Sequence, residues 1–336
     1  MKKNKITLGI LAVALGGVST LAMAAPQGAP KPGPKFSGQI GINAGWQSGQ
    51  DFEVGSYDSR FGLNGMHFLG NTKLIYTATV HHSTYEANHY GSDLDVREAV
   101  VIAITDYGNF VASAAGQIAA YTDVVSKVDI HEVNTGNTGS HDYLFSQQRY
   151  GTQAVAYATP KWNGLQLKFN AVTPDCHSGK DLDIVGGGLY YDKGAIYAGF
   201  NYAQISGEML GGKDTDAKGY RGVFQHRGDA LTLAAVVEAN VDTAGVDSTV
   251  YAASAIYKYN NLEFRLSHQF KDWDGDLDDN HLTIASAHYP VSENFSLFVE
   301  GAHYSDRLSK VEGWGPNATT IYTSDSNFNL GFITKF

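Results

Sequence analysis

The sequence predicts an all-β protein whose strands close into a transmembrane antiparallel β-barrel of 16 strands. Three features support this fold class: an export signal at the N-terminus, strands that alternate apolar and polar residues, and connections that alternate between short and long. No stretch after the signal approaches the roughly 18 uninterrupted apolar residues of a membrane-spanning helix. A mature chain that resides in a membrane would therefore have to cross it as a barrel.

The first 24 residues have the three parts of a secretory signal. Three lysines within the first five residues form the charged start, residues 6–18 are apolar apart from one threonine and glycines, and residues 22–24 read Ala-Met-Ala. We therefore expect a signal peptide at residues 1–24 and export from the cytoplasm. A proline-rich periplasmic lead with little sheet character is expected at 25–35, and the barrel at 36–336.

Composition excludes several classes of function. The 336-residue chain carries a net charge of -10, and loss of the three signal lysines would leave -13. An acidic chain is a poor partner for nucleic acid. Tyrosine (20) and glycine (38) are abundant, as in barrels with aromatic girdles. Cys176 is the single cysteine, so no intramolecular disulfide can form. We expect no cofactor.

The strands alternate with a period of two. Along residues 262–271, leucine and phenylalanine occupy one face and charged or amide side chains most of the other; residues 36–46, 165–171 and 231–238 show a similar rhythm. A charged face along a whole strand fits a water-filled lumen. The final stretch, 325–336, is also apolar on one side and ends on Phe336. Taken alone, that last stretch would also suit an edge strand of a soluble sandwich.

Connection lengths predict the strand count. Very short turns alternate with longer polar connections, as in bacterial outer-membrane barrels. The segmentation places strand starts near Phe36, Ser56, Thr72, Asp95, Phe110, Gln148, Leu165, Asp183, Ala195, Ala217, Ala230, Ser248, Leu262, Asn280, Phe295 and Asp325. Sixteen strands imply an aqueous channel, whereas about eight would leave an interior filled by side chains.

Several short motifs follow one another along the chain. They are Ser59–Gly65 (SRFGLNG), Arg97-Glu-Ala, Tyr121-Thr-Asp123, Arg149-Tyr-Gly and the terminal Phe336. In this order the chain resembles, from Phe36 to Phe336, the trimeric general diffusion porins of Gram-negative outer membranes. The resemblance implies a third loop that folds into the lumen and narrows the pore, with basic wall residues facing acidic loop residues. It also implies a homotrimer, a setting of lipid and lipopolysaccharide, and a C-terminal strand and Phe336 that serve as the signal to the barrel-assembly machinery.

Three arginines are the candidates for the basic wall of the constriction: Arg60, Arg97 and Arg149. An arginine facing lipid near the midplane would cost roughly 2–4 kcal/mol, so we expect all three in the lumen. Strand alternation would then turn Val100 and Ile102, on the strand of Arg97, and Ala154, on the strand of Arg149, toward lipid. The alternative for the arginines is salt bridging within the wall.

The third loop supplies the candidate acidic residues Asp123, Asp129 and Glu132. Asp129 and Glu132 occupy positions similar to the acidic pair of the family's constriction loop. This chain departs from the family there: Ile130–Gly136 (IHEVNTG) replaces the usual Pro-Glu-Phe-Gly-Gly turn, and the acidic residues are one residue closer together. The two charged rows would form a transverse field across the pore. The alternative for the loop is a solvated surface position.

The expected function is passive diffusion of ions and small hydrophilic solutes, with mild cation preference from the excess of carboxylates. A substrate-specific channel is the alternative. Its mark would be aromatics along the lumen, for which Phe298 and Tyr304 have the inward register. An enzyme is disfavoured because no G-x-S-x-G or similar signature occurs. A soluble periplasmic sheet protein would be distinguished by extraction without detergent.

Weaker candidate sites remain. Residues 272–279 superficially resemble a calcium loop, but Thr283 stands where a bidentate glutamate is required. We interpret them as an acidic outer loop, with loose cation bridging to lipopolysaccharide phosphates as the alternative. His81 and His82 point to opposite strand faces, so no metal site is expected there. Residues 111–120 are rich in small side chains, which suit either close packing against another subunit or a small-residue lining.

Overall fold

The computed structural model describes residues 33–47, 52–82, 95–117, 119–134, 144–145, 150–173, 182–207, 216–242, 247–275, 279–312 and 319–336. The predicted signal peptide, Arg149 and Cys176 lie outside these ranges. The strands of the first half are β1 (Gly33–Gln47), β2 (Glu53–Ser56), β3 (Ser59–Leu69), β4 (Thr72–His82), β5 (Asp95–Thr105), β6 (Gly108–Gln117), β7 (Tyr150–Ala158), β8 (Leu165–Val172) and β9 (Ile184–Lys193). Those of the second half are β10 (Ile196–Ile205), β11 (Ala217–Arg227), β12 (Leu231–Val241), β13 (Ser248–Tyr259), β14 (Leu262–Trp273), β15 (Asn280–Ser292), β16 (Phe295–Glu312) and β17 (Thr319–Lys335).

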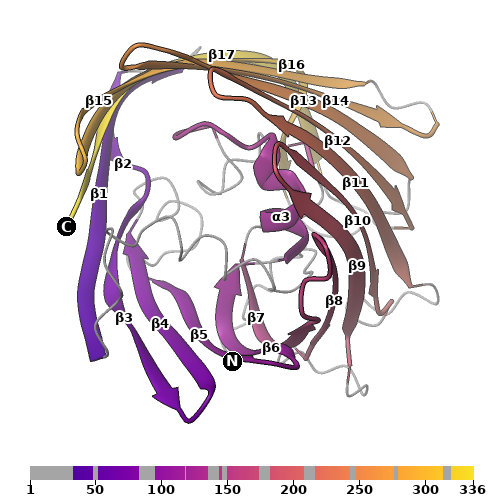
Figure 1. Cartoon of the computed structure of the whole chain (residues 1–336). Helices are drawn as coiled ribbons and strands as arrows, with labels where there is room; N and C mark the ends of the chain where they lie inside the picture. The colour runs from indigo at the N-terminus through magenta and orange to yellow at the C-terminus, as the bar shows by residue number, and fades with distance from the viewer. Residues whose placement is uncertain are drawn as a thin grey trace, which may run out of the picture.

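These strands form one closed antiparallel ring (Figure 1). Each pairs with its neighbours in sequence, and β1 closes the ring by pairing with β17 from Gln39↔Lys335 to Gln47↔Asn327. Both β2 and β3 pair with β1, and only Tyr57 and Asp58 separate them, so together they fill one position in the wall. The described strands therefore make a sixteen-position barrel, which confirms the predicted fold class.

The observed strand starts follow the predicted segmentation. Strands β4, β8 and β14 begin at the predicted residues Thr72, Leu165 and Leu262. The first and last strands begin earlier in the sequence than predicted. Strand β1 begins at Gly33, inside the predicted proline-rich lead, because Gly33 already pairs with Met66 of β3. Strand β17 begins at Thr319 rather than near Asp325, because the β16–β17 hairpin continues beyond its neighbours.

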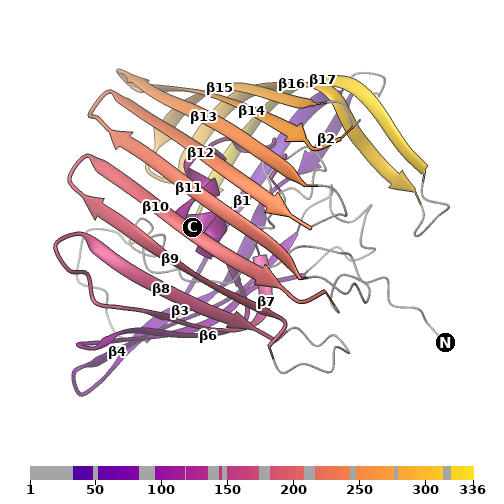
Figure 2. The ribbon, with the colours of Figure 1, turned by 90° about the vertical axis from the view of Figure 1, so that its right-hand side faces the viewer.

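The tilted strands join in tight turns at one rim of the barrel (Figure 2). Two residues connect β13 to β14, and Asn260 there has a φ of 52°, a left-handed conformation that asparagine tolerates better than most residues. The same rim carries the short connections β3–β4, β5–β6, β9–β10, β11–β12 and β15–β16. The described turns thus agree with the short rim expected from the sequence.

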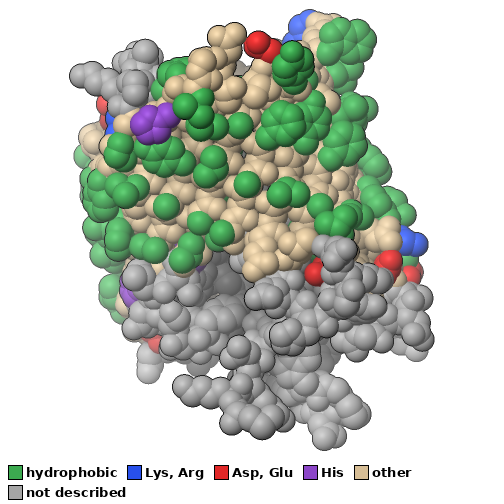
Figure 3. Space-filling view, turned by 90° about the horizontal axis from the view of Figure 1, so that it is seen from below, with side chains coloured by type: hydrophobic (Ala, Val, Ile, Leu, Met, Phe, Trp, Pro, Cys, Tyr) green, Lys and Arg blue, Asp and Glu red, His purple; other side chains and the backbone are tan. Residues whose placement is uncertain are grey.

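Opposite faces of each strand differ in chemistry. On β14, Phe264 and Leu266 are 43% and 51% exposed on the outside, whereas Ser267 and Gln269 are buried on the inside. Figure 3 shows one outer face, where hydrophobic side chains are spread over the described wall and charged side chains gather at its edges. No helix among the described residues is long and apolar enough to span a membrane. The outward apolar and inward polar pattern predicted from period two is therefore present.

A β-bulge changes the predicted faces of β5. The register shifts between Ala99 and Val100, and one extra residue reverses the alternation after it. Ile102 is consequently buried inside against Val111, while its neighbour Val101 is exposed. The expectation that Val100 and Ile102 face lipid was wrong for this reason.

The predicted face of Ala154 on β7 was also wrong. Ala154 is buried, and its neighbour Val155 is 59% exposed on the outside. The prediction counted the alternating faces of β7 from Arg149, a residue that lies outside the described ranges. Near β5–β7 the inner wall is therefore more apolar than the sequence predicted.

Phe336 lies at the seam where β17 meets β1. Its backbone N–H donates to the Gly38 carbonyl and its carbonyl accepts from the Gly38 N–H, both at 3.0 Å. The ring lies 6.0 Å from that of Phe36. A Cβ on Gly38 would come within 2.6 Å of Phe336 Cζ, so the glycine makes room for the terminal ring.

We predict that Phe336→Ala lowers the free energy of unfolding by about 0.5–1.5 kcal/mol more than an outward-facing control, because it removes an aromatic pair as well as apolar surface. Phe200→Ala on β10 is the control, since Phe200 is exposed to a similar extent on the outer wall. Unfolding midpoints of the detergent-folded barrel measure the difference. Equal losses for the two variants would contradict a special role of the seam.

Candidate functional site

The segment of residues 119–134, called the inner segment below, lies inside the ring of strands. It contains helix α3 (Ala119–Asp123) and the short helix η1 (Val125–Lys127), and Figure 1 shows α3 within the ring beside β10–β12. Its apolar side chains join a buried cluster with inward-facing residues of β9–β13, whose members are Tyr121, Val124, Val125, Val128, Phe145, Tyr190, Tyr197, Ala203, Val223, Ala234, Val236, Val250 and Ala252. Burial of this apolar surface holds the segment against the wall.

Two polar contacts fix the first half of the inner segment. Lys168 Nζ of β8 donates hydrogen bonds to both carboxylate oxygens of Asp123 at 2.8 Å, and the Asp123 side chain is nearly buried. The Ser254 hydroxyl of β13 donates to the Lys127 carbonyl at 2.7 Å. Asp123 was predicted as part of an acidic row. The structure gives it a different partner, because Lys168 neutralises it at the wall.

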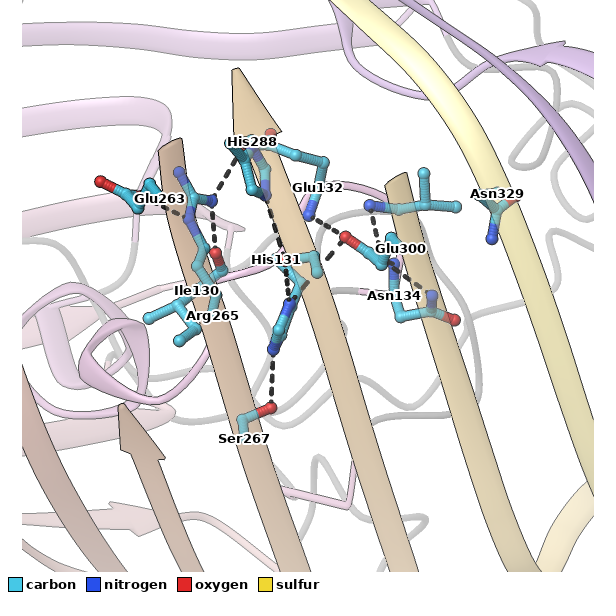
Figure 4. Close-up of polar contacts among 12 residues, drawn as sticks. Ile130, His131, Glu132, Asn134, Glu263, Arg265, Ser267, His288, Glu300 and Asn329 are labelled. Atoms are coloured by element: carbon cyan, nitrogen blue, oxygen red, sulfur yellow. Dashed lines mark hydrogen bonds and ion pairs between the residues drawn. The ribbon is translucent and has the colours of Figure 1, made fainter. Parts of the chain in front are cut away.

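Arg265 of β14 binds the second half of the inner segment (Figure 4). Its Nη1 donates to the Ile130 carbonyl at 2.5 Å and to Glu132 Oε1 at 3.0 Å, and its Nε donates to Glu263 Oε1 at 2.6 Å. One guanidinium therefore satisfies a loop carbonyl and two carboxylates. Glu132, predicted to face wall arginines across the pore, is instead paired with an arginine on its own side.

Glu300 of β16 accepts hydrogen bonds from three consecutive backbone N–H groups. The distances are 2.8 Å from Glu132, 3.1 Å from Val133 and 2.6 Å from Asn134, and Asn134 Nδ2 adds a fourth bond at 2.7 Å. The Glu300 side chain is fully buried. Successive N–H groups that converge in this way form an anion-binding nest, and here the anion is a side chain of the wall (Figure 4).

His131 lies between two wall hydroxyls. Nδ1 is 2.9 Å from Ser286 Oγ and Nε2 is 2.9 Å from Ser267 Oγ. Burial, with the nearby Arg265 cation adding to it, lowers the pKa of His131 to about 3. The ring is therefore neutral near neutral pH, and both nitrogens contact a hydroxyl. The inner segment thus places an uncharged imidazole in a polar slot of the wall.

Ser286, His288 and Glu132 are arranged in the order of a hydrolytic triad. His288 Nε2 is 3.1 Å from Ser286 Oγ, and His288 Nδ1 is 3.7 Å from Glu132 Oε1. A nucleophile must be reachable and its base must be oriented by a close acid. Ser286 and His288 are buried, and Arg265 already engages Glu132. We therefore interpret the set as part of the contacts that hold the inner segment.

The predicted basic wall lies on the opposite side of the ring. Arg97 Nη1 contacts Asp58 Oδ1, and its side chain is almost fully buried. Arg60 lies 3.6 Å from Asp58 Oδ2, donates to Gln39 Oε1 at 3.1 Å and is 31% exposed. Pairing within the wall, the alternative weighed from the sequence, therefore describes Arg97 best. Arg60 remains partly open to the lumen.

Asp129 completes the predicted acidic set. It is half-buried in the inner segment, after η1, and its backbone N–H donates to the Val125 carbonyl at 2.9 Å. The structure thus gives three of the candidate charges separate partners. Asp123 pairs with Lys168, Glu132 with Arg265, and Arg97 with Asp58.

Sequence reasoning missed the residues that hold the inner segment. Arg265 and Glu263 were recognised only as inward charges of residues 262–271, and Glu300 was not singled out as a site residue. The available signal was their charge on a lumen face, which a segment inside the barrel can neutralise. The residues around Asp58 give no sign that it pairs with Arg97, because the two residues are 39 positions apart in the sequence.

Comparisons with known proteins agree with this architecture. The sequence profile of the Gram-negative porin family matches residues 11–308. An anion-selective porin from Comamonas acidovorans has a similar structure, with a TM-score of 0.73 at 15% identity over 90% of this chain and 99% of that one. A Salmonella typhi OmpF complex with daunomycin gives 0.69 at 14%, over 90% and 97%. The trimer form of OmpT, an outer membrane protein of Vibrio cholerae, gives 0.66 at 13%, over 90% and 99%. A search of curated proteins found no match.

We predict that Glu300→Gln loosens the inner segment, because a neutral amide accepts the nest N–H groups less strongly than a carboxylate does. Charge-assisted hydrogen bonds are roughly twice as strong as neutral ones, so a loss of about 1–3 kcal/mol in docking is expected. Limited trypsin cleavage after Lys127 measures docking. Glu293→Gln, at an exposed glutamate of the β15–β16 turn, is the control, and equal cleavage rates in both variants would contradict the prediction.

We also predict that docking weakens in acid. The pKa of His131 is lower when docked, about 3, than the ordinary value of 6.5. Protonation therefore favours the undocked state, and docking stability is complete above pH 6.5 and falls as pH drops toward 3, by up to about 1.4 kcal/mol per unit. Hydrogen exchange of residues 125–134 against pH measures this slope. His131→Gln should flatten it, and a slope that is unchanged in this variant would contradict the prediction.

Proposed function

The chain belongs to the Gram-negative porin family and is an outer-membrane channel for diffusion, and we propose that the inner segment forms the narrow part of its pore. Ions and small hydrophilic solutes would pass between this segment and the wall that carries Arg60. No chemical step is involved. The exported, signal-cleaved chain remains the expected form.

The docking of the inner segment along one side of the lumen carries this proposal. Its apolar cluster covers β9–β13, and its polar contacts reach β14–β16. The strands β1, β3 and β5, with Arg60 and Arg97, lie across the ring from the apolar cluster on β9–β13 (Figure 1). The free passage is then bounded by the edge of the segment that carries the half-buried Asp129 and Glu132, and by the arginine wall. Asp58 weakens the proposed transverse field, because it neutralises part of that wall.

Selectivity follows from which charges remain uncompensated. Several lumen charges are locally paired, as in Arg221–Glu238 at 2.6 Å and Lys168–Asp123 at 2.8 Å. Local pairs contribute little net field, so the overall charge of the signal-cleaved chain, -13 once the three signal lysines are removed from -10, has the larger influence on ions entering the mouth. We therefore propose mild cation preference. The Comamonas porin, similar in structure, is anion-selective, so fold alone does not set the sign.

The partners of the outer wall are part of the proposal. The outward face of β6 carries the small exposed residues Ala112 and Ala114, which permit close approach of another subunit. A related structure is a trimer. We propose a homotrimer in lipid and lipopolysaccharide, with the C-terminal strand and Phe336 serving the barrel-assembly machinery.

The described lumen gives little support to a substrate-specific sugar channel. Phe298 and Tyr304 do face inward, but both are buried. Phe298 packs edge-on against Tyr57, and the Tyr304 hydroxyl donates to Asn134 Oδ1 at 2.8 Å. A stacking platform requires an open ring face. These two aromatics instead support the inner segment.

The first test is conductance in a planar bilayer. We expect steps that occur in threes and a linear current–voltage relation, because three passive pores would insert together. In a salt gradient the reversal potential should show mild cation preference. Single steps would contradict the trimer, and an anion-selective potential would contradict the preference without affecting the pore.

The second test neutralises the edge of the inner segment. The double variant Asp129→Asn, Glu132→Gln should shift the reversal potential toward anions, because it removes two negative charges and leaves Arg265 less compensated. Asp229→Asn, exposed at the short-turn rim, is a control of similar chemistry. Equal shifts in both proteins would place the inner segment outside the narrow part of the pore.

A further inference from the structure

A row of polar side chains crosses the outer face of β14–β17. His268 pairs in register with Thr283, Thr283 with His303, and His303 with Ser326. Both histidines of the row are exposed, and so is His281, two residues before Thr283 on the same face. Outward positions elsewhere on these strands, such as Leu266, are apolar. A hydrophilic patch on the apolar face of a barrel requires a physical explanation.

Two of these imidazoles are close enough to share a ligand. The ring centres of His268 and His281 lie 5.7 Å apart, with 34° between the ring planes. Two nitrogens bound to one tetrahedral metal at about 2.0–2.1 Å each are about 3.3 Å apart. Rings with centres at the observed separation can reach that distance by a small rotation. The pair therefore has the spacing of two ligands on one ion.

Neighbouring groups favour a metal at this pair. Thr283 Oγ1 lies 2.8 Å from Nδ1 of His268, which leaves Nε2 as the nitrogen for a metal. A hydrogen bond at the other ring nitrogen is the usual way in which a protein orients a metal-binding histidine. The acidic residues Asp272 and Asp279 are exposed one residue beyond the Lys271↔Asn280 pair, near His281, and add negative charge there.

We propose that His268 and His281 bind one divalent transition-metal ion on the outer face of the barrel, near the long-loop end of the β14–β15 hairpin. Imidazole ligands suit copper, nickel and zinc, and copper binds most strongly in this series. Within the described residues no group of three or more His, Cys, Asp or Glu side chains could hold a metal. The site is thus open, with water in the remaining positions, and exchanges its ion readily.

His303 provides a matched internal control. It is exposed on the same face, and its Nδ1 lies 2.8 Å from Ser326 Oγ, much as His268 contacts Thr283. It differs from His268 in that no imidazole partner is found for it among the described residues. A single oriented histidine and an oriented pair can therefore be compared in one protein.

The test is binding of Cu²⁺ alone to the detergent-folded full chain, followed by electron paramagnetic resonance and titration. We expect a two-nitrogen signal that His268→Gln and His281→Gln each remove and that His303→Gln leaves intact. Thr283→Val should weaken binding about 10–100-fold, because the orienting hydroxyl is lost. No two-nitrogen signal in the wild type, or its survival in His268→Gln or His281→Gln, would overturn the proposal.

A second measurement uses the unaltered protein, in case a variant fails to fold. Cu²⁺ should slow carbethoxylation of His268 and His281, measured residue by residue by mass spectrometry, and leave His303 unprotected. Equal protection of the three histidines, or none, would overturn the proposal. Neither experiment depends on conductance, so a failed pore assay would not affect the result.

Discussion

The structure depends on one constraint: a segment carried inside a barrel must satisfy its backbone and bury its apolar side chains against a wall that is otherwise wet. Residues 119–134 meet this constraint in two ways. Their valines and Tyr121 pack against inward valines, alanines and tyrosines of β9–β13. Their last N–H groups converge on the buried carboxylate of Glu300. The apolar half supplies burial, and the polar half fixes position because hydrogen bonds are directional.

The charges of the lumen are organised around this docking. Arg265 donates hydrogen bonds to the Ile130 carbonyl, Glu132 and Glu263. Its positive charge therefore mainly stabilises the inner segment, and only the part that these carboxylates leave uncompensated acts on passing ions. Across the ring, Asp58 has the same effect on Arg97. A pore built from locally paired charges is hydrated and polar without a strong sign. In the proposed function, the acidic mouth therefore decides the ion preference.

Sequence alone predicted the barrel because strand alternation and turn spacing are local properties. Leu262–Trp273 shows both, and its start was predicted to the residue. The bulge at Ala99 was not predictable in this way, because one extra residue leaves no local mark and reverses the face of Ile102. The structure places Arg60 and Arg97 on strands and Asp123, Asp129 and Glu132 in the inner segment. Their partners, such as Lys168 for Asp123, depend on contacts between distant parts of the chain.

The central claim is that the channel conducts while the inner segment is docked against the wall. A covalent cross-link between the segment and the wall tests this claim most directly. Ser254 and Lys127 are in contact in the structure, with Ser254 Oγ 2.7 Å from the Lys127 carbonyl. In a Cys176→Ser background, Ser254→Cys and Lys127→Cys should be joined by a short, reducible bifunctional thiol reagent, and single-channel conductance should be the same before and after reduction. A pair that does not cross-link, or a channel that opens only on reduction, would contradict the account.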